Sequence, residues 1–206
     1  MTKEPFKEAL IPPNSGGSGA RKILVVTDKP LRELGVADKA VAKLTASDAQ
    51  VAWYDGVQPD PTFDQVAEGA AIARREGSEV VVAVGGGSSM DAAKIIAAAA
   101  TSDENPADWV GFGTVKHEVL KLYAIPTTSG TGSEATMGAV ITDAAAHEKH
   151  IISGGSLMPA AAALDSDLLL GLPPHITAAT GMDALTHGIE AYIGVWERGT
   201  RAEDAR

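Results

Sequence analysis

Residues 79–97, with the sequence EVVVAVGGGSSMDAAKIIA, decide the fold of this chain. The run 79–84 is apolar and rich in valine, which is typical of a strand buried on both faces within a parallel sheet. Three consecutive glycines follow, and then a helical run from Ala92. Glycines let an anion approach the backbone closely, and the first turn of a helix presents unpaired N–H groups. The stretch therefore predicts a strand, a phosphate-binding turn and a helix in succession.

The turn at 85–91 matches neither of two common phosphate-binding motifs. It lacks the G-x-G-x-x-G spacing, and no Gly-Lys-Ser/Thr follows it as in a Walker A loop. A simpler interpretation is a tight turn in which Ser88 is the N-cap and Asp91 occupies N3, as in a capping box. Three glycines in a row cost backbone entropy, however, so a turn alone rarely requires them. We therefore favour a phosphate contact here.

On both sides of this stretch, short apolar runs alternate with helical patterns. Strands are expected at 23–26, 51–54, 79–84, 122–126 and 162–165, helices at 36–44 and 62–76, and a hairpin of 139–142 with 149–153. After Pro173 and Pro174 the sequence becomes helical, starting near Thr177. Strands that alternate with helices are typical of an α/β domain with a mostly parallel sheet flanked by helices.

Size and composition exclude several classes of protein. The 206 residues suit one larger domain, or one domain with part of a second, and 45% of them are apolar. The formal net charge of −10 argues against nucleic acid or an anionic membrane as main partner, because both are polyanionic. The absence of cysteine excludes thiolate ligands and a cysteine nucleophile.

The N-terminal region has the composition of a linker. Residues 1–8 are charged and lack the apolar core of a signal peptide, and residues 12–19, PPNSGGSG, are turn and linker chemistry. No apolar run in the sequence is long enough to span a membrane. We therefore expect a linker over 1–21 and a cytoplasmic protein.

Three polar features could line a ligand site. Asp28 ends the first predicted strand, where a carboxylate can accept from an adenosine ribose and repel a 2′-phosphate, favouring NAD over NADP. On the residue pattern alone, an ordinary aspartate in a strand-to-helix turn is the favoured interpretation. The loop 126–136, PTTSGTGSEAT, offers many hydroxyl donors, although a surface turn has the same composition. Lys149 can counter a pyrophosphate or simply be solvated.

Asp183 and His187 form a separate candidate site. Side chains at i and i+4 lie on one helix face, so a carboxylate and a neutral imidazole at this spacing can bind one cation such as zinc or iron(II). Such a pair is more often a hydrogen-bonded surface pair. A catalytic metal site also needs three or four protein ligands, and sixteen residues follow Glu190.

Four segments together point to a family. The segments are 85–94, the loop 126–136, Leu-Pro-Pro at 172–174, and 179–187. In this order and from about Lys22 onward, the chain resembles the N-terminal part of the iron-containing (group III) alcohol dehydrogenases. The resemblance implies a Rossmann-like dinucleotide-binding domain over 22–174 and, from 175, the beginning of an all-helical metal-binding domain. The active site is then expected in the cleft between the two domains.

The resemblance also implies roles for individual residues. Asp183 and His187 match the first two metal ligands, for iron(II) or zinc. The positions that match the NAD site are Asp28 at the ribose, Gly86, Gly87 and Ser88 at the pyrophosphate, and Thr127, Thr128, Thr136 and Lys149 along the rest of the cleft. No further catalytic side chain is implied beyond the metal site.

The chain departs from the family pattern in three places. The family takes two more histidine ligands from later helices, which would lie beyond Arg206. Residues 14–19 stand where relatives have a strand pair and a helix, and Asp60 stands where they can carry an asparagine near the adenine. We therefore expect a truncated chain that binds metal weakly and turns over poorly or not at all.

The expected function is that of an NAD-dependent, metal-dependent alcohol dehydrogenase acting on a small alcohol or aldehyde. Uncovered apolar helix surface would allow homo-oligomers to form. One alternative is a non-catalytic nucleotide-binding module that lacks the metal domain. Another is a relative of the same architecture that uses NAD and zinc without net oxidation, such as dehydroquinate synthase, although the spacing of Asp183 and His187 argues against it.

Overall fold

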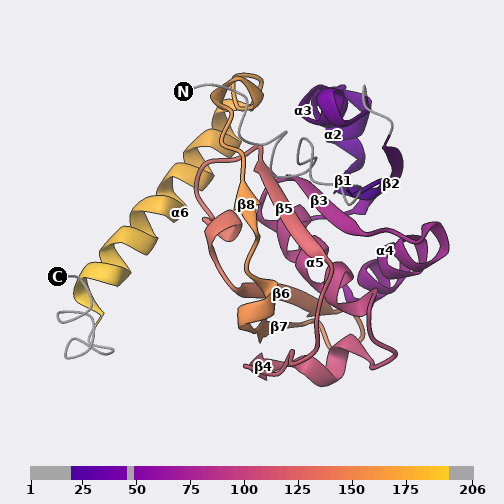
Figure 1. The fold of residues 1–206 in the computed structure, drawn as a ribbon. Coiled ribbons are helices and arrows are strands. Elements are labelled where there is room, and N and C mark those ends of the chain that lie inside the picture. Colours follow the sequence, from indigo (N-terminus) through magenta and orange to yellow (C-terminus); the bar gives the residue numbers. More distant parts are fainter. Residues whose placement is uncertain (1–19, 46–48, 195–206) are drawn as a thin grey trace, which may run out of the picture.

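The computed structural model describes residues 20–45 and 49–194. In these residues a five-stranded parallel sheet lies between helices, with a three-stranded sheet beside it (Figure 1). This architecture confirms the predicted α/β class. The expected linker at 12–19 lies outside the described residues.

The order in which strands are added to the main sheet reverses once. Its strands are β1 (Lys22–Asp28), β2 (Gln50–Val57), β3 (Val80–Gly85), β5 (Lys121–Pro126) and β8 (Ala161–Ala162). They lie in the order β2-β1-β3-β5-β8, and each is parallel to its neighbours. The chain therefore moves from β1 to β2 on one side and then returns to β3 on the other side of β1. This reversal creates a topological switch point between β1 and β3, which is where ligands of such sheets usually bind.

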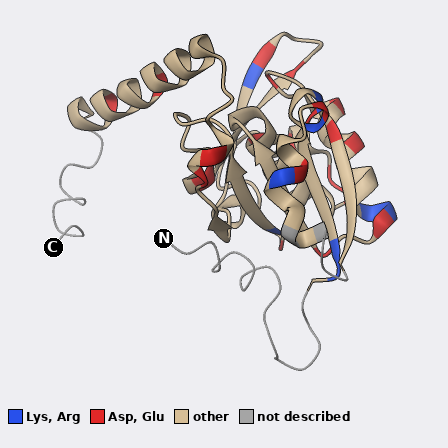
Figure 2. Ribbon diagram, turned by 90° about the horizontal axis from the view of Figure 1, so that it is seen from above, with Lys and Arg blue, Asp and Glu red and all other residues tan. Residues whose placement is uncertain are grey.

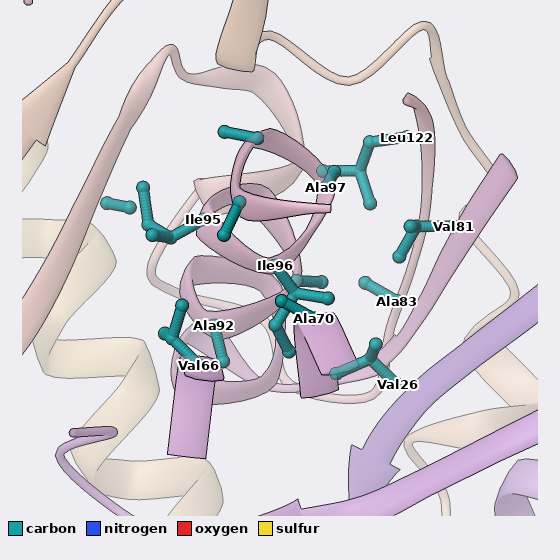
Figure 3. Close-up of a cluster of buried hydrophobic side chains, with 14 of the residues drawn as sticks. Val26, Val66, Ala70, Val81, Ala83, Ala92, Ile95, Ile96, Ala97 and Leu122 are labelled. Carbon is teal, nitrogen blue, oxygen red and sulfur yellow. The ribbon is translucent and has the colours of Figure 1, made fainter. Parts of the chain in front are cut away.

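Helices cover both faces of the sheet, because side chains alternate along each strand. Leu24 and Val26 of β1 pack with α4 (Phe63–Glu76) and α5 (Gly87–Ala99). Figure 3 shows Val26 beside side chains of both helices. Ile23 and Val25 point the other way and pack with α3 (Val36–Thr45), which the short helix α2 (Lys29–Glu33) precedes. All six residues of β3 are buried, as its valine-rich sequence predicts.

The predicted helix at 62–76 is confirmed together with both of its ends. Thr62 is the N-cap of α4, and its side chain accepts a hydrogen bond from the N–H of Gln65 at 3.4 Å. Gly77 ends the helix in the left-handed conformation, with φ 64°. Glycine adopts this conformation without the steric penalty that other residues incur, so its position stops the helix.

The smaller sheet contains the predicted hairpin. Strands β6 (Gly138–Asp143) and β7 (Glu148–Ser153) pair antiparallel, and β4 (Gly111–Phe112) pairs with β7. Helix α5 packs against both β3 and β6 and so joins the two sheets. Four short 3₁₀ helices complete the description: η1 (Pro106–Trp109), η2 (Ser133–Ala135), η3 (Gly155–Leu157) and η4 (Ser166–Leu168).

Helix α6 (Pro174–Ile193) extends away from the sheets (Figure 1). None of its residues is buried. The predicted start near Thr177 is wrong, because the helix begins one turn earlier at Pro174, where the fixed φ of proline suits the first helical position. Its exposed apolar side chains are Met182, Leu185, Ile189, Tyr192 and Ile193. Over residues 20–45 and 49–194, no helix combines the length and apolar character that crossing a bilayer requires.

Candidate cofactor and metal site

Three segments that are far apart in the sequence meet at one edge of the main sheet. Strands β1, β3 and β5 are parallel, so their carboxyl ends lie at the same edge. Asp28 ends β1, the glycine turn follows β3, and the hydroxyl-rich loop follows β5. The N–H of Thr127 donates to the carbonyl of Gly85 at 2.9 Å, which brings the loop directly beside the turn. Asp28, the glycine turn and the start of the hydroxyl-rich loop therefore lie at the same edge of the sheet, next to the switch point.

The glycine turn leaves the start of α5 open. Helix α5 begins at Gly87, and its N-cap is Gly86, which makes no side-chain capping hydrogen bond. The first N–H groups of a helix have no partner within it, so they are available to an anion. A Cβ on Gly86 would lie 3.2 Å from the Thr128 side chain, and one on Gly87 would lie 2.9 Å from Thr131. Side chains larger than hydrogen would therefore close this space.

The capping interpretation of this turn is wrong. Gly86 is the N-cap in place of Ser88, and the Asp91 carboxylate does not cap the helix. Asp91 instead accepts from the Ser133 hydroxyl at 2.7 Å and from the Val140 N–H at 2.9 Å. The Asp91 carboxylate therefore bonds to groups 42 and 49 residues away in the sequence instead of capping its own helix. Local sequence spacing does not reveal such distant partners.

Thr128 carries an unsatisfied hydroxyl next to this opening. Its Oγ1 is buried and makes no hydrogen bond to the described protein. A buried hydroxyl without a partner costs free energy comparable to a lost hydrogen bond, so native proteins rarely contain one unless a water or ligand completes it. The neighbouring Thr127, the first residue after β5, is also buried. The hydroxyls of Thr27, Ser78 and Thr142 are in the same state, and Thr128 is of interest because its side chain packs against Gly86 of the glycine turn.

Asp28 has a structural role in addition to the one predicted. It is the N-cap of α2, and its Oδ1 accepts from the N–H of Leu31 at 2.8 Å. Burial raises the pKa of the Asp28 carboxyl, and the bond from Leu31 opposes that shift. This is the strand-to-helix turn that the sequence left open. The cap occupies one carboxylate oxygen at the switch point, and contact with a ribose remains a prediction.

A buried lysine, Lys94, is the feature that sequence reasoning missed. Its side chain has no exposed surface, and its Nζ donates to the hydroxyls of Ser133 and Thr136 and to the carbonyl of Gly138. Burial lowers the pKa of the Lys94 ammonium, against the attraction of Asp91 and Glu134. Burial also raises the pKa of the Asp91 carboxyl, which its hydrogen bonds oppose. A signal was present, because every residue of α5 from 92 to 99 other than Lys94 is Ala or Ile, so the lysine lies in the apolar part of the helix.

Lys149 and Thr136 each have a partner within the protein. Lys149 Nζ lies 2.7 Å from Oδ1 of Asp60, and both side chains are more than half exposed. Asp60 adopts a positive φ of 57°, which aspartate tolerates better than most residues. The hydroxyl of Thr136 accepts from Lys94 at 3.2 Å. The assignment of both residues to a cofactor site stays a prediction.

Asp183 and His187 lie on one face of α6, as their spacing predicts. The Nε2 of His187 is 3.7 Å from Oδ1 of Asp183, and the side chains are 56% and 43% exposed, respectively. Two ligands at about 2.1 Å from one tetrahedral cation would be about 3.4 Å apart, so this pair needs little adjustment to share a metal. Helix α6 carries Asp183 and Glu190 and contains no Lys or Arg (Figure 2). Across the described part of the chain, no group of three or more His, Cys, Asp or Glu side chains could hold a metal.

Helix α6, which carries Asp183 and His187, contacts the hydroxyl-rich loop 126–136 at Gly130. A Cβ on Gly130 would overlap the backbone carbonyl of Thr180. Asp183 and His187 lie about one and two turns beyond Thr180. The loop beside the glycine turn therefore also touches the helix of the metal pair.

The fold and site define a parallel α/β protein with an open helix N-terminus at its switch point. A model of the iron-containing alcohol dehydrogenase family matches residues 11–166. This confirms the resemblance found in the sequence, and the chain belongs to that family.

Three similar proteins show how much of a relative this chain represents. It is 44% identical over 176 residues to alcohol dehydrogenase 4 of Schizosaccharomyces pombe, covering 85% of this chain and 42% of that protein. It is 40% identical over 175 residues to an NAD-dependent methanol dehydrogenase of Bacillus methanolicus, covering 85% and 46%. The structure of sulfoacetaldehyde reductase from Bifidobacterium kashiwanohense in complex with NAD+ matches with a TM-score of 0.78 and 35% identity, covering 91% and 47%. The chain therefore spans less than half the length of these relatives.

Proposed function

We propose that this chain supplies the NAD-binding part and the first two metal ligands of an alcohol dehydrogenase. The reaction would be the reversible transfer of a hydride between NAD and a small alcohol or aldehyde. The observation that carries the proposal is the uncapped start of α5 at the switch point, beside the unsatisfied Thr128 hydroxyl. Its family membership and the NAD+ in the Bifidobacterium structure support NAD as the ligand.

The cofactor's pyrophosphate would lie against the first turn of α5. The N–H groups from Gly87 and Ser88 point out of the helix start, where the partial positive charge of the helix favours an anion. Glycine at 86 and 87 lets the turn pack closely against Thr128 and Thr131, where a Cβ would be too near. The hydroxyl of Thr128 would then gain the partner that it lacks within the described protein.

The carboxylate of Asp28 would select NAD over NADP. It stands at the end of β1, on the other side of the switch point from the glycine turn. A carboxylate accepts hydrogen bonds from a ribose and repels a 2′-phosphate. The cap on α2 would hold that carboxylate in place through its bond from Leu31.

Asp183 and His187 would hold the divalent metal, iron(II) or zinc. Their donors are already within 3.7 Å of each other on one face, and α6 places no Lys or Arg near them along its length. When bound, the nicotinamide exchanges a hydride with substrate and the metal polarises the substrate oxygen. The chain's own residues bind and orient these groups. Two donors satisfy only part of the coordination that a catalytic metal needs.

A second function is favoured by one observation. Because the described residues contain no group of three metal-binding side chains, this chain by itself could act as a nucleotide-binding module without turnover. Both functions predict NAD binding. They differ in whether a short alcohol reduces the bound NAD at all: slow reduction that requires the metal supports the first function, and no reduction supports the module.

Calorimetric titration with NAD and NADP, followed by an absorbance assay for NADH, tests both functions. We expect NAD to bind more tightly than NADP, and Asp28→Asn to narrow that preference. Tighter binding of NADP, or no binding of NAD, would refute the cofactor assignment. With an added divalent metal, we expect weak metal binding and little or no oxidation of a short alcohol. Robust oxidation that a chelator abolishes would show that this chain is an enzyme by itself, whereas NAD binding without turnover would support the module.

We also propose that the chain has no nucleic-acid or membrane partner and forms homo-oligomers through the exposed apolar side chains of α6. The net charge of −10 supports the first part of this proposal. Sedimentation of the purified chain at several concentrations tests the second. A monomer at all concentrations would refute it.

A further inference from the structure

The buried ammonium of Lys94 connects α5 to the loop after β5. Its Nζ donates to Ser133 Oγ at 2.8 Å, to Thr136 Oγ1 at 3.2 Å and to the Gly138 carbonyl at 2.6 Å. These acceptors are 39 to 44 residues away in the sequence and lie within six consecutive positions. One side chain thus holds the end of the loop at three points.

Asp91, one turn earlier on α5, completes the connection. Ser133 donates its hydroxyl proton to Asp91 Oδ1 at 2.7 Å while accepting from Lys94, and Asp91 Oδ2 accepts from the Val140 N–H at 2.9 Å. Lys94 Nζ and Asp91 Oδ1 are 3.8 Å apart. The Asp91 carboxylate and the Ser133 hydroxyl compensate the buried ammonium charge of Lys94 within the protein, as a buried charge requires.

This geometry excludes direct contact between Lys94 and a cofactor. A lysine ammonium has three N–H donors, and the three bonds to the loop use all of them. The side chain also has no exposed surface from which to reach a ligand. Any influence of Lys94 on cofactor binding must therefore pass through the loop.

The other end of that loop lies beside the glycine turn. Thr128 packs against Gly86, next to the helix start where we place the pyrophosphate, and no helix or strand forms between Pro126 and Ser133. Since regular structure does not fix these residues, contacts with the rest of the protein determine where the Thr128 hydroxyl lies. The loop is held by the bond from Thr127 to Gly85, by the packing of Gly130 against the Thr180 carbonyl, and by Lys94.

We propose that Lys94 is a positioning residue that holds the loop 127–138 against α5 and thereby places the Thr128 hydroxyl at the phosphate site. The proposal rests on the function proposed above, since it concerns the same site. In this proposal, Lys94 and Asp91 bond only to other groups of the protein, and residues of the loop contact the ligand.

Hydrogen exchange of Lys94→Met tests the attachment without any cofactor. The backbone N–H groups of residues 128–138 should exchange at least about tenfold faster than in the unsubstituted chain, because local opening no longer breaks three hydrogen bonds. The matched control is Lys116→Met, which removes an exposed lysine outside this network and should leave the loop unchanged. Unchanged exchange of the loop in Lys94→Met would overturn the proposal. If Lys94→Met does not fold, Ser133→Ala removes the shared hydroxyl and serves for the same measurement.

A double-mutant cycle on NAD affinity tests the link to the site. Lys94→Met should weaken NAD binding about tenfold, the effect of losing one well-placed hydrogen bond, and should weaken it much less when Thr128 is already alanine. A merely structural role predicts that the two effects add, and additive effects would overturn the proposal. If the unsubstituted chain binds no NAD, the proposed function fails, while the exchange of the loop still supports or overturns the attachment.

Discussion

Replacing Gly86 with alanine separates the folding of α5 from the proposed phosphate contact. Gly86 has φ −83° and ψ −167°, a conformation that alanine also adopts. A Cβ at this position would lie 3.2 Å from Oγ1 and Cγ2 of Thr128. The methyl group would therefore fill the gap between the turn and the unsatisfied hydroxyl, while the backbone remains unstrained.

The change should cost little stability and much affinity. Alanine is roughly 0.5–1 kcal/mol worse than glycine at an N-cap. For a chain of this size that corresponds to a fall of about 1–4 °C in Tm. Two charge-assisted hydrogen bonds to phosphate are worth about 1.5 kcal/mol each at the low end of their range. Losing both would raise the Kd for NAD by a factor of about 100 or more.

Calorimetric titration with NAD, together with thermal unfolding, measures both effects. Gly171→Ala is the matched control, because a Cβ on Gly171 would meet no atom within 4 Å and this residue lies outside the site. We expect Gly171→Ala to bind NAD like the unsubstituted chain. A folded Gly86→Ala chain whose Kd is within about threefold of the original would refute a phosphate contact at this turn.

Three further substitutions test the core, the contact of α6 and the buried charge. Ile96→Ala removes a fully buried side chain between α5 and α4, so the free energy of unfolding in urea should fall by about 3 kcal/mol. A loss below about 1 kcal/mol would contradict the described packing. Gly130→Ala would force the Thr180 carbonyl aside, so hydrogen exchange in the first turns of α6 should become faster; exchange like that of the unsubstituted chain would count against this contact. The third substitution is Lys94→Met, studied as a function of pH. Because the folded-state pKa of Lys94 lies below its ordinary 10.5, the unfolded chain binds more protons between those two values. The stability of the unsubstituted chain relative to Lys94→Met should therefore rise as the pH increases toward 10.5, and a flat or falling difference would contradict the pKa direction.

Local sequence patterns predicted most of the elements. The valine-rich sequence of β3 and the continuous apolar run of β1 reflect strands that are buried on both faces, and such burial leaves a direct trace in the order of apolar residues. Thr62 and Gly77 mark the ends of α4 through their own conformational preferences. The start of α6 was misplaced by a turn, because the two prolines were interpreted as ending a loop when Pro174 is the first helical residue.

The candidate site was predicted less completely than the fold. The glycine turn and the i,i+4 pair on α6 are local patterns, so both appear where they were expected. The partners of Asp91 and Lys94 were not predicted, because they come from a loop about 40 residues away and nothing near α5 in the sequence indicates them. The pairing of Lys149 with Asp60 spans 89 residues and was missed for the same reason.

The amino-acid sequence by itself determined most of the strands and helices, and where a phosphate could approach a helix start, although the strand expected at 162–165 is Ala161–Ala162. Hydrophobic periodicity and the conformational freedom of glycine act over a few residues, so they can be read along the chain. Only the tertiary structure decided that β1 and β3 are neighbours, that Asp28 lies at the resulting switch point, and that Lys94 is buried under the loop beside it. Hydrophobic periodicity shows that one face of a strand or helix is buried, but it does not show which element buries it. The covering element depends on the order of the strands in the sheet.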